Sequence, residues 1–138
     1  MLNFLPSDDK NEILKIRGRT EELRIRAGQP ISVTYSADGI RKKKLLSRIY
    51  SYKDIDEILL KLCDYSVFGK DESIRQGFIT SSEGERVGIC GNVVKDDEKI
   101  STIKQITSMC VRLPNDVEGL ALPFFRIIGE KTSSTLVI

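Results

Sequence analysis

The sequence has 138 residues and no histidine. Histidine is the usual general base of serine and cysteine hydrolases and a common ligand of protein-bound metals. A Ser-His-Asp triad, a Cys-His pair and a histidine-based metal site are therefore excluded within this chain. Cysteine is scarce as well: Cys63, Cys90 and Cys110 are far apart and none belongs to a C-x-x-C pair. They predict buried free thiols and neither a disulfide framework nor a zinc site.

Long apolar runs and a dominant charge are also missing. No segment approaches the roughly 20 apolar residues that a transmembrane helix needs. The N-terminus reaches Asp8 and Asp9 without the basic region of a signal peptide, so we expect a cytoplasmic protein. The 22 basic and 20 acidic residues leave a net charge of +2, which is too balanced to predict nucleic-acid binding from bulk charge.

The densest basic run covers residues 41–44 and allows two interpretations. Lysines on an edge strand discourage pairing with the edge of another sheet. Alternatively, the run contacts phosphate or acidic lipid. No aromatic side chains are interleaved with it to stack on bases, which favours the edge strand.

Helix signals occur in three places. Ser51 and Asp54 have the spacing of an N-cap and its N3 carboxylate, and apolar residues follow at helical intervals. Asp9 and Glu12 also have capping-box spacing, and Gly77 predicts the end of a short helix. The predicted helices cover residues 7–17, 51–63 and 70–76.

Alternating apolar and polar residues predict the strands. Gly84, Gly88 and Gly91 lie in or beside one of them and suggest bulges or close backbone approach. The fold class is therefore α+β, a small and mostly antiparallel sheet with helices packed on one face. The predicted strands cover residues 21–27, 31–35, 40–46, 78–80, 85–94 and 106–113.

The end of the sequence predicts a domain boundary. A helix is expected over residues 120–128, and residues 135–138 form an apolar run with β character. A buried strand of this kind opens a parallel sheet and precedes a P-loop. We therefore expect residues 1–134 to be a non-catalytic domain and residues 135–138 to begin a truncated P-loop ATPase domain.

Motifs that carry chemistry are absent. The sequence has no G-x-x-x-x-G-K-[ST], and the glycine-rich residues 84–91 do not form a G-x-G-x-x-G that opens a helix. We predict no catalytic residue and no metal site within the chain.

Four arginines in strand-like segments are the candidate site residues: Arg24, Arg26, Arg86 and Arg112. In one interpretation each stem packs on the sheet while the charged head lies in water. In the other, the guanidinium groups are presented to phosphate held by a neighbouring domain, where a permanent charge and a bidentate fork are useful.

Four segments, in order, resemble the N-terminal region of the stage III sporulation protein AA family, ATPases similar to type II and type IV secretion ATPases. The most specific is the G-x-R-V-G-x-x-G block of residues 84–91, preceded by a G-[FY]-[IV]-T block. Residues 1–20 and 41–44 carry no specific match. The matching segments are residues 21–30, 74–80, 84–91 and 106–113.

The resemblance implies a small non-catalytic α+β domain that packs against a C-terminal ATPase domain across a hinge and contributes to a hexameric ring. The parent protein would bind ATP and Mg²⁺. Arg86 and Arg112, followed by Arg24 and Arg26, would be the candidates to reach nucleotide phosphates across the domain interface. The implied partners are that ATPase domain, other copies in the ring and the membrane proteins of a sporulation channel, at the cytoplasmic face of a membrane.

Two other function classes remain as alternatives. A nucleic-acid-binding module would use the strand arginines and the basic run at residues 41–44. A stand-alone enzyme is the least favoured, because the sequence shows no metal spacing, no phosphate loop and no nucleophile–base pair. Nucleic acid is not an expected partner, because the net charge is balanced and no aromatic residues are interleaved with the basic run.

Overall fold

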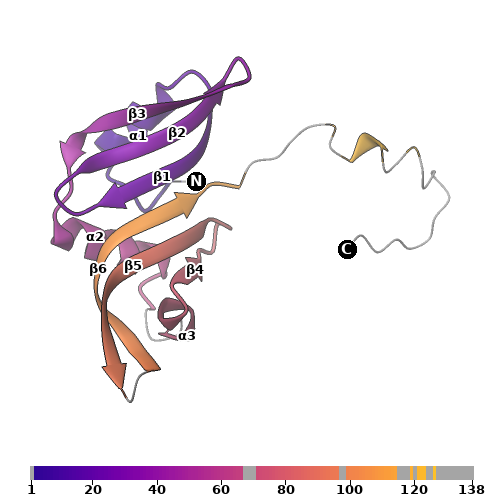
Figure 1. The fold of residues 1–138 in the computed structure, drawn as a ribbon. Helices are drawn as coiled ribbons and strands as arrows, with labels where there is room; N and C mark the ends of the chain where they lie inside the picture. The colour runs from indigo at the N-terminus through magenta and orange to yellow at the C-terminus, as the bar shows by residue number, and fades with distance from the viewer. Residues whose placement is uncertain are drawn as a thin grey trace.

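A computed structural model describes residues 2–66, 71–96, 99–114, 119, 121–123 and 126. Its elements are α1 (Ser7–Leu14), β1 (Arg19–Arg26), β2 (Pro30–Ala37), β3 (Ile40–Ile49), α2 (Tyr52–Leu62), α3 (Asp71–Arg75), β4 (Phe78–Thr80), β5 (Arg86–Asp96) and β6 (Lys99–Arg112). The strands form one six-stranded sheet in the order β3-β2-β1-β6-β5-β4, with antiparallel neighbours throughout (Figure 1). The predicted α+β class is confirmed. Within the described residues, no helix has the length and apolar character needed to cross a membrane.

One face of the sheet is the core. Leu23 of β1 lies opposite Val33 of β2 and Val111 of β6, and Val111 lies opposite Val87 of β5. All four side chains are fully buried, so they form a continuous apolar row across the middle of the sheet. Helices α1 and α2 lie behind the sheet in Figure 1. The helices add Ile13, Ile55, Ile58, Leu59, Leu62 and Ile74 to the same core.

Helix α2 begins as the sequence predicts. The Ser51 hydroxyl accepts from the Asp54 amide at 3.2 Å, and the Asp54 carboxylate accepts from the Ser51 amide at 2.7 Å. This capping box satisfies two backbone donors at the helix start. The short helix α3 ends just before Gly77, whose φ of +81° is the left-handed conformation that favours glycine after a helix.

The capping box predicted at Asp9 and Glu12 is wrong. Helix α1 starts after Pro6 without a side-chain cap and ends at Leu14, earlier than expected. Asp9 is buried and accepts from the Tyr50 hydroxyl at 2.5 Å, while Glu12 accepts from the Ser47 amide at 3.1 Å. Both carboxylates hold α1 against the end of β3, a use that their local spacing does not reveal.

The β5–β6 hairpin is longer than predicted, because β6 starts at Lys99 and not near residue 106. The pairing register shifts between Cys90 and Gly91, which confirms a bulge at Gly91. Gly88 pairs in regular register, and Gly84 lies in the β4–β5 turn with φ +87°.

Two predicted elements lie wholly or largely outside the described residues. The helix expected over residues 120–128 is described only at residues 121–123 and 126. The run at residues 135–138, and with it the proposed domain boundary, lies entirely outside them.

Gly91 and Gly88 form a matched pair for testing the bulge. A Cβ at Gly91 would lie 2.1 Å from the Gln105 carbonyl oxygen, whereas a Cβ at Gly88 would meet nothing nearer than 4.0 Å. We expect Gly91→Ala to lower the free energy of unfolding by about 1–3 kcal/mol, because backbone must move. Gly88→Ala should change it by less than about 1 kcal/mol. Urea denaturation measures both, and equal effects would contradict the bulge geometry.

Candidate functional site

The sheet face opposite the core carries the four candidate arginines, and all four are exposed. We call this surface the arginine face, defined by Arg24, Arg26, Arg86 and Arg112. Three cross-strand rows over β1, β6 and β5 build it: Glu22–Arg112–Arg86, Arg24–Cys110–Gly88 and Arg26–Ser108–Cys90.

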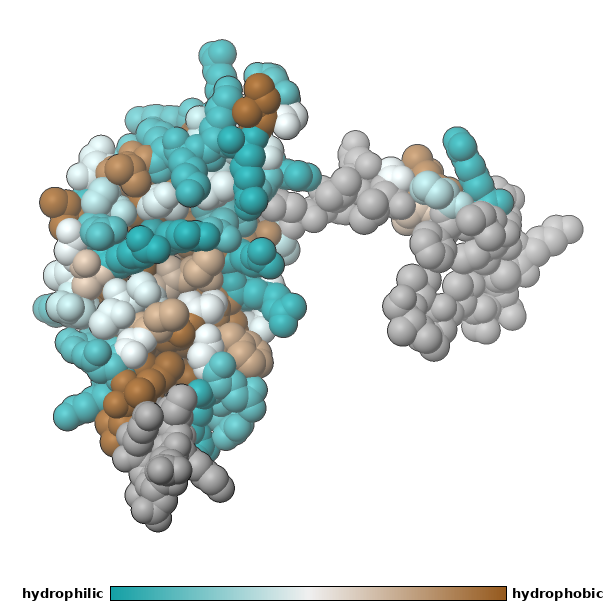
Figure 2. Space-filling model, in the orientation of Figure 1, coloured by the Kyte–Doolittle hydropathy of each residue, from teal (hydrophilic) through white to brown (hydrophobic). Residues whose placement is uncertain are grey.

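Strand alternation places these arginines together. Leu23 and Ile25 of β1 are fully buried, so Arg24 and Arg26 must point to the other face. Val111 and Val87 do the same for the arginines that neighbour them in β6 and β5. Figure 2 shows this face, with hydrophilic residues in a band across β1 and β6 and hydrophobic residues toward the β5–β6 hairpin. The structure therefore brings all four predicted site residues to one surface.

Glu22 is the acidic member of the arginine face, and only 7% of its surface is exposed. Arg24 Nε donates to Glu22 Oε1 at 2.7 Å, and Arg112 Nε lies 3.9 Å from Oε2. Burial acts to raise the pKa of Glu22, but the hydrogen bond and charge of Arg24, with the charge of Arg112, hold it below the ordinary value. Glu22 is thus ionised at neutral pH. It is hydrogen-bonded to Arg24 and lies within ion-pair distance of Arg112.

Arg26 and Arg86 differ from the other two. Among the described residues, no carboxylate lies within 4.0 Å of either guanidinium group. Arg86 is also directly opposite Arg112 in the sheet, and like charges at opposed positions destabilise a strand pair. The arginine face therefore has an excess of positive charge that an anion would balance.

Two hollows flank Arg24 and Arg26. One, of about 400 Å³, extends toward β3 and is also lined by Ser32 and Lys43. The other, of about 310 Å³, extends over β6 and β5, where Gly88 has no side chain to fill the space beside Cys110. A ligand could approach the paired arginines from either side.

The cysteines are free thiols, as predicted, but the prediction that all three are buried is wrong: Cys63 is buried, Cys110 is half-buried and Cys90 is exposed on the strand face opposite the core. Cys110 lies on the arginine face, where burial, followed by the charge of Glu22, raises its pKa. A raised pKa keeps the thiol protonated at neutral pH, so Cys110 is not poised as a nucleophile. Among the described residues, no group of three or more His, Cys, Asp and Glu side chains could hold a metal ion.

The basic run at residues 41–44 lies on β3, an edge strand, as the first interpretation predicts. Arg41 Nε is 3.0 Å from Glu21 Oε2, and Lys44 Nζ is 3.3 Å from Glu12 Oε1. Lys43 lines the hollow next to Arg24 and Arg26. The run is therefore divided among separate contacts and does not form one basic patch.

The sequence did not single out Glu22. Its signal was its position two residues before Arg24 on an alternating strand, which places both side chains on the same face. The partnership with Arg112 depends on β1 pairing with β6, and that pairing joins distant parts of the chain.

Comparison with known proteins identifies the family. The family described as "Sporulation stage III, protein AA" matches residues 10–138. The chain belongs to this family. The stage III sporulation protein AA of Bacillus subtilis (strain 168) is 27% identical over 139 residues, which cover 97% of this chain and 44% of that relative. The chain thus spans less than half the length of this curated member of the sporulation stage III AA family.

A solved structure gives a looser comparison. The VirB11 ATPase of the Brucella suis type IV secretion system, in complex with sulphate, aligns with 94% of this chain and 37% of its own length. The sequence identity is 13% and the TM-score is 0.47, a likeness too distant to support an argument.

The low pKa of Glu22 predicts a pH-dependent stability. Because the folded-state pKa lies below the ordinary 4.5, ionised Glu22 stabilises the fold at neutral pH, and this contribution is lost as the pH falls from 4.5 through the folded-state pKa. Glu22→Gln should cost about 1 kcal/mol at neutral pH, because the exposed head of Arg24 is screened by solvent. The difference from the unchanged chain should shrink in acid.

Urea unfolding over a pH series measures this effect. Glu57→Gln, at an exposed position on α2, is the control and should have little effect at any pH. A Glu22→Gln penalty that stays constant into acid would contradict the assignment.

Proposed function

We propose that this chain is the non-catalytic, regulatory and assembly domain of a sporulation-associated, secretion-type hexameric ATPase. In this proposal the arginine face contacts phosphates of a nucleotide held by a neighbouring ATPase domain. The observation that carries it is that four arginines from three strands gather on the face of the sheet opposite the core, around the buried carboxylate of Glu22. Membership of the sporulation stage III AA family supports the biological setting.

The four arginines divide into two pairs with different roles. Arg24 donates a hydrogen bond to Glu22, and Arg112 lies within ion-pair distance of the same carboxylate. Arg26 and Arg86 have no carboxylate within reach among the described residues and can bind an anion without breaking an ion pair. Guanidinium groups suit phosphate oxygens because their charge is permanent and their donors are planar and paired.

The chemistry of hydrolysis would belong to the ATPase domain. The sequence has no P-loop, so the phosphate cradle, the Mg²⁺ ligands and the catalytic groups must come from outside this chain. The phosphates of ATP, bound there together with Mg²⁺, would supply the negative charge that the arginine face meets. A rigid sheet in contact with the phosphates would move as a unit when ATP is hydrolysed and phosphate is released.

The remaining parts of the proposal concern assembly. Copies of the parent protein would form a ring, in which each sheet meets the ATPase domain of its own or a neighbouring subunit. The ring would sit at the cytoplasmic face of a membrane and work with the membrane proteins of the sporulation channel. The resemblance of four segments to the stage III sporulation protein AA family, ATPases similar to secretion ATPases, motivates these expectations.

The direct test uses the full-length protein. Arg26→Ala combined with Arg86→Ala should lower ATP turnover by about tenfold to a hundredfold, as expected when two charge-assisted hydrogen bonds to phosphate are lost. Arg75→Ala, on α3 at the helical side of the sheet, is the matched control and should leave turnover unchanged. Light scattering follows ring assembly in parallel. Equal turnover in both variants would refute the phosphate contact.

The nucleic-acid alternative has one observation in its favour, because Lys43 lines the same hollow as Arg24 and Arg26. If it holds, this chain should bind single-stranded DNA at low salt with an affinity that falls steeply as salt is added. Fluorescence anisotropy measures the binding. No binding at low salt would remove this alternative and leave the nucleotide contact unaffected.

A further inference from the structure

Gly88 is a glycine that the fold does not require. It lies inside β5 and pairs in regular register with Phe78 and Cys110, away from the bulge at Gly91. Its φ is not positive, so other residues could adopt the same backbone conformation. A Cβ at this position would meet only the Cys110 carbonyl oxygen, at 4.0 Å. Glycine weakens a strand, and with no bulge or close backbone contact to explain it, the close approach of a ligand does.

The space over Gly88 is open. Phe78 lies directly opposite on β4, yet none of its atoms comes within 4 Å of the position that a Cβ of residue 88 would take. The hollow of about 310 Å³ beside Arg24 and Arg26 extends over this position. Small side chains surround it on β5 and β6. We call this part of the hollow the Gly88 recess, formed by Gly88, Cys90, Ser108 and Cys110.

Arginines border the Gly88 recess on two sides. Arg24 and Arg26 of β1 line the hollow itself. Arg86 precedes Gly88 by two residues on the same face of β5, about 7 Å along the strand. No acidic residue is among the described lining residues, and Glu22, the partner of Arg24, lies outside the hollow. An anion over the recess would therefore meet positive charge that carboxylates do not fully balance.

Ser108 adds a neutral donor to the recess. It lies between Arg26 of β1 and Cys90 of β5 in one cross-strand row. Its side chain is half-buried and makes no hydrogen bond within the described part of the chain. The hydroxyl is thus available to an oxygen of a ligand. The protonated thiol of Cys110 beside it adds no negative charge.

We propose that the Gly88 recess is where a phosphate group meets the arginine face, and that glycine at position 88 permits its close approach. This inference rests on the proposed function and deepens it, because it chooses between the two hollows beside Arg24 and Arg26. The hollow toward β3 lies on the opposite side of β1 from β6 and β5. Over the recess, one ligand can meet arginines of both β1 and β5.

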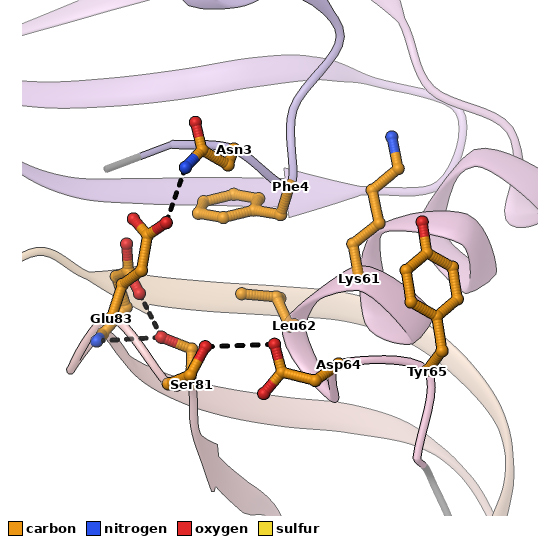
Figure 3. A pocket seen from close by; sticks show the side chains of 10 residues that line it. Asn3, Phe4, Lys61, Leu62, Asp64, Tyr65, Ser81 and Glu83 are labelled. Carbon is orange, nitrogen blue, oxygen red and sulfur yellow. Dashed lines mark hydrogen bonds between the residues drawn. The ribbon is translucent and has the colours of Figure 1, made fainter.

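A hollow elsewhere on the surface lacks these features (Figure 3). It has a volume of about 240 Å³ and lies between the residues before α1, the end of α2 and the β4–β5 turn. Its carboxylates, those of Asp64, Glu83 and Glu85, already accept hydrogen bonds from neighbouring side chains. Lys61 is the one basic residue among the described lining residues. Phosphate would find no excess of positive charge there.

The test is an NMR titration of this chain with inorganic tripolyphosphate at low salt, with sodium chloride at equal ionic strength as the control. We expect saturable shifts of the amides of residues 86–90 and 108–112. Gly88→Val should weaken binding about tenfold, because a side chain over the recess removes at least one charge-assisted hydrogen bond. The amide spectrum of the variant also shows whether it is folded.

Two further variants keep the inference falsifiable. Ser108→Ala removes the hydroxyl without adding volume; it should weaken binding about threefold and decides the matter if Gly88→Val fails to fold. Ser32→Thr adds one methyl group to the hollow toward β3 and is the matched control, which should bind as the unchanged chain does. Shifts centred on residues 29–32 and 43–45, no saturable shifts, or unchanged binding in folded Gly88→Val would overturn the inference.

The inference and the proposed function fail in different ways. Gly88→Val could leave tripolyphosphate binding unchanged while Arg26→Ala with Arg86→Ala lowers ATP turnover of the full-length protein; only the position of the phosphate would then be wrong. If Gly88→Val weakens binding while the double arginine variant keeps its turnover, the recess binds phosphate and the proposed function is wrong.

Discussion

The buried row that joins Val33, Leu23, Val111 and Val87 across four neighbouring strands determines the rest of the structure. Side chains alternate between the faces of a strand, so burial of this row directs its neighbours outward. A slip of one residue in β1, β5 or β6 would turn the arginines of that strand into the core, where an unpaired charge is costly. The same packing that holds the helices therefore also sets the direction of the arginines.

Local signals in the sequence were sufficient where an element is defined by its own residues. Helix α2 carries its capping box and apolar stripe within one segment, and the strands show their alternation directly. These local signals failed where a side chain contacts a distant part of the chain. Asp9 has the spacing of a cap, yet it accepts a hydrogen bond from Tyr50, which follows β3. Gly88 and Gly91 look alike in the sequence, and only the partner strand distinguishes an ordinary position from a bulge.

In the candidate site, too, some features follow from local residues and others depend on distant contacts. Each arginine could be placed on a strand from the sequence, but their convergence depends on β1 lying beside β6, which local patterns do not specify. Glu22 then acts on both sides of that contact, since Arg24 belongs to its own strand and Arg112 to the partner strand. The family match shows that this chain is a member of the sporulation stage III AA family.

The contact between β1 and β6 has a consequence for biosynthesis. Strands β1 to β3 form one meander and β4 to β6 another, and each is built from neighbours in the sequence. The two join only when Leu23 meets Val111, so the edge of β1 stays unpaired during synthesis until residue 111 has left the ribosome. Arg24 and Arg26 come from the first meander and Arg86 and Arg112 from the second. The positively charged surface therefore forms only when the two halves have joined.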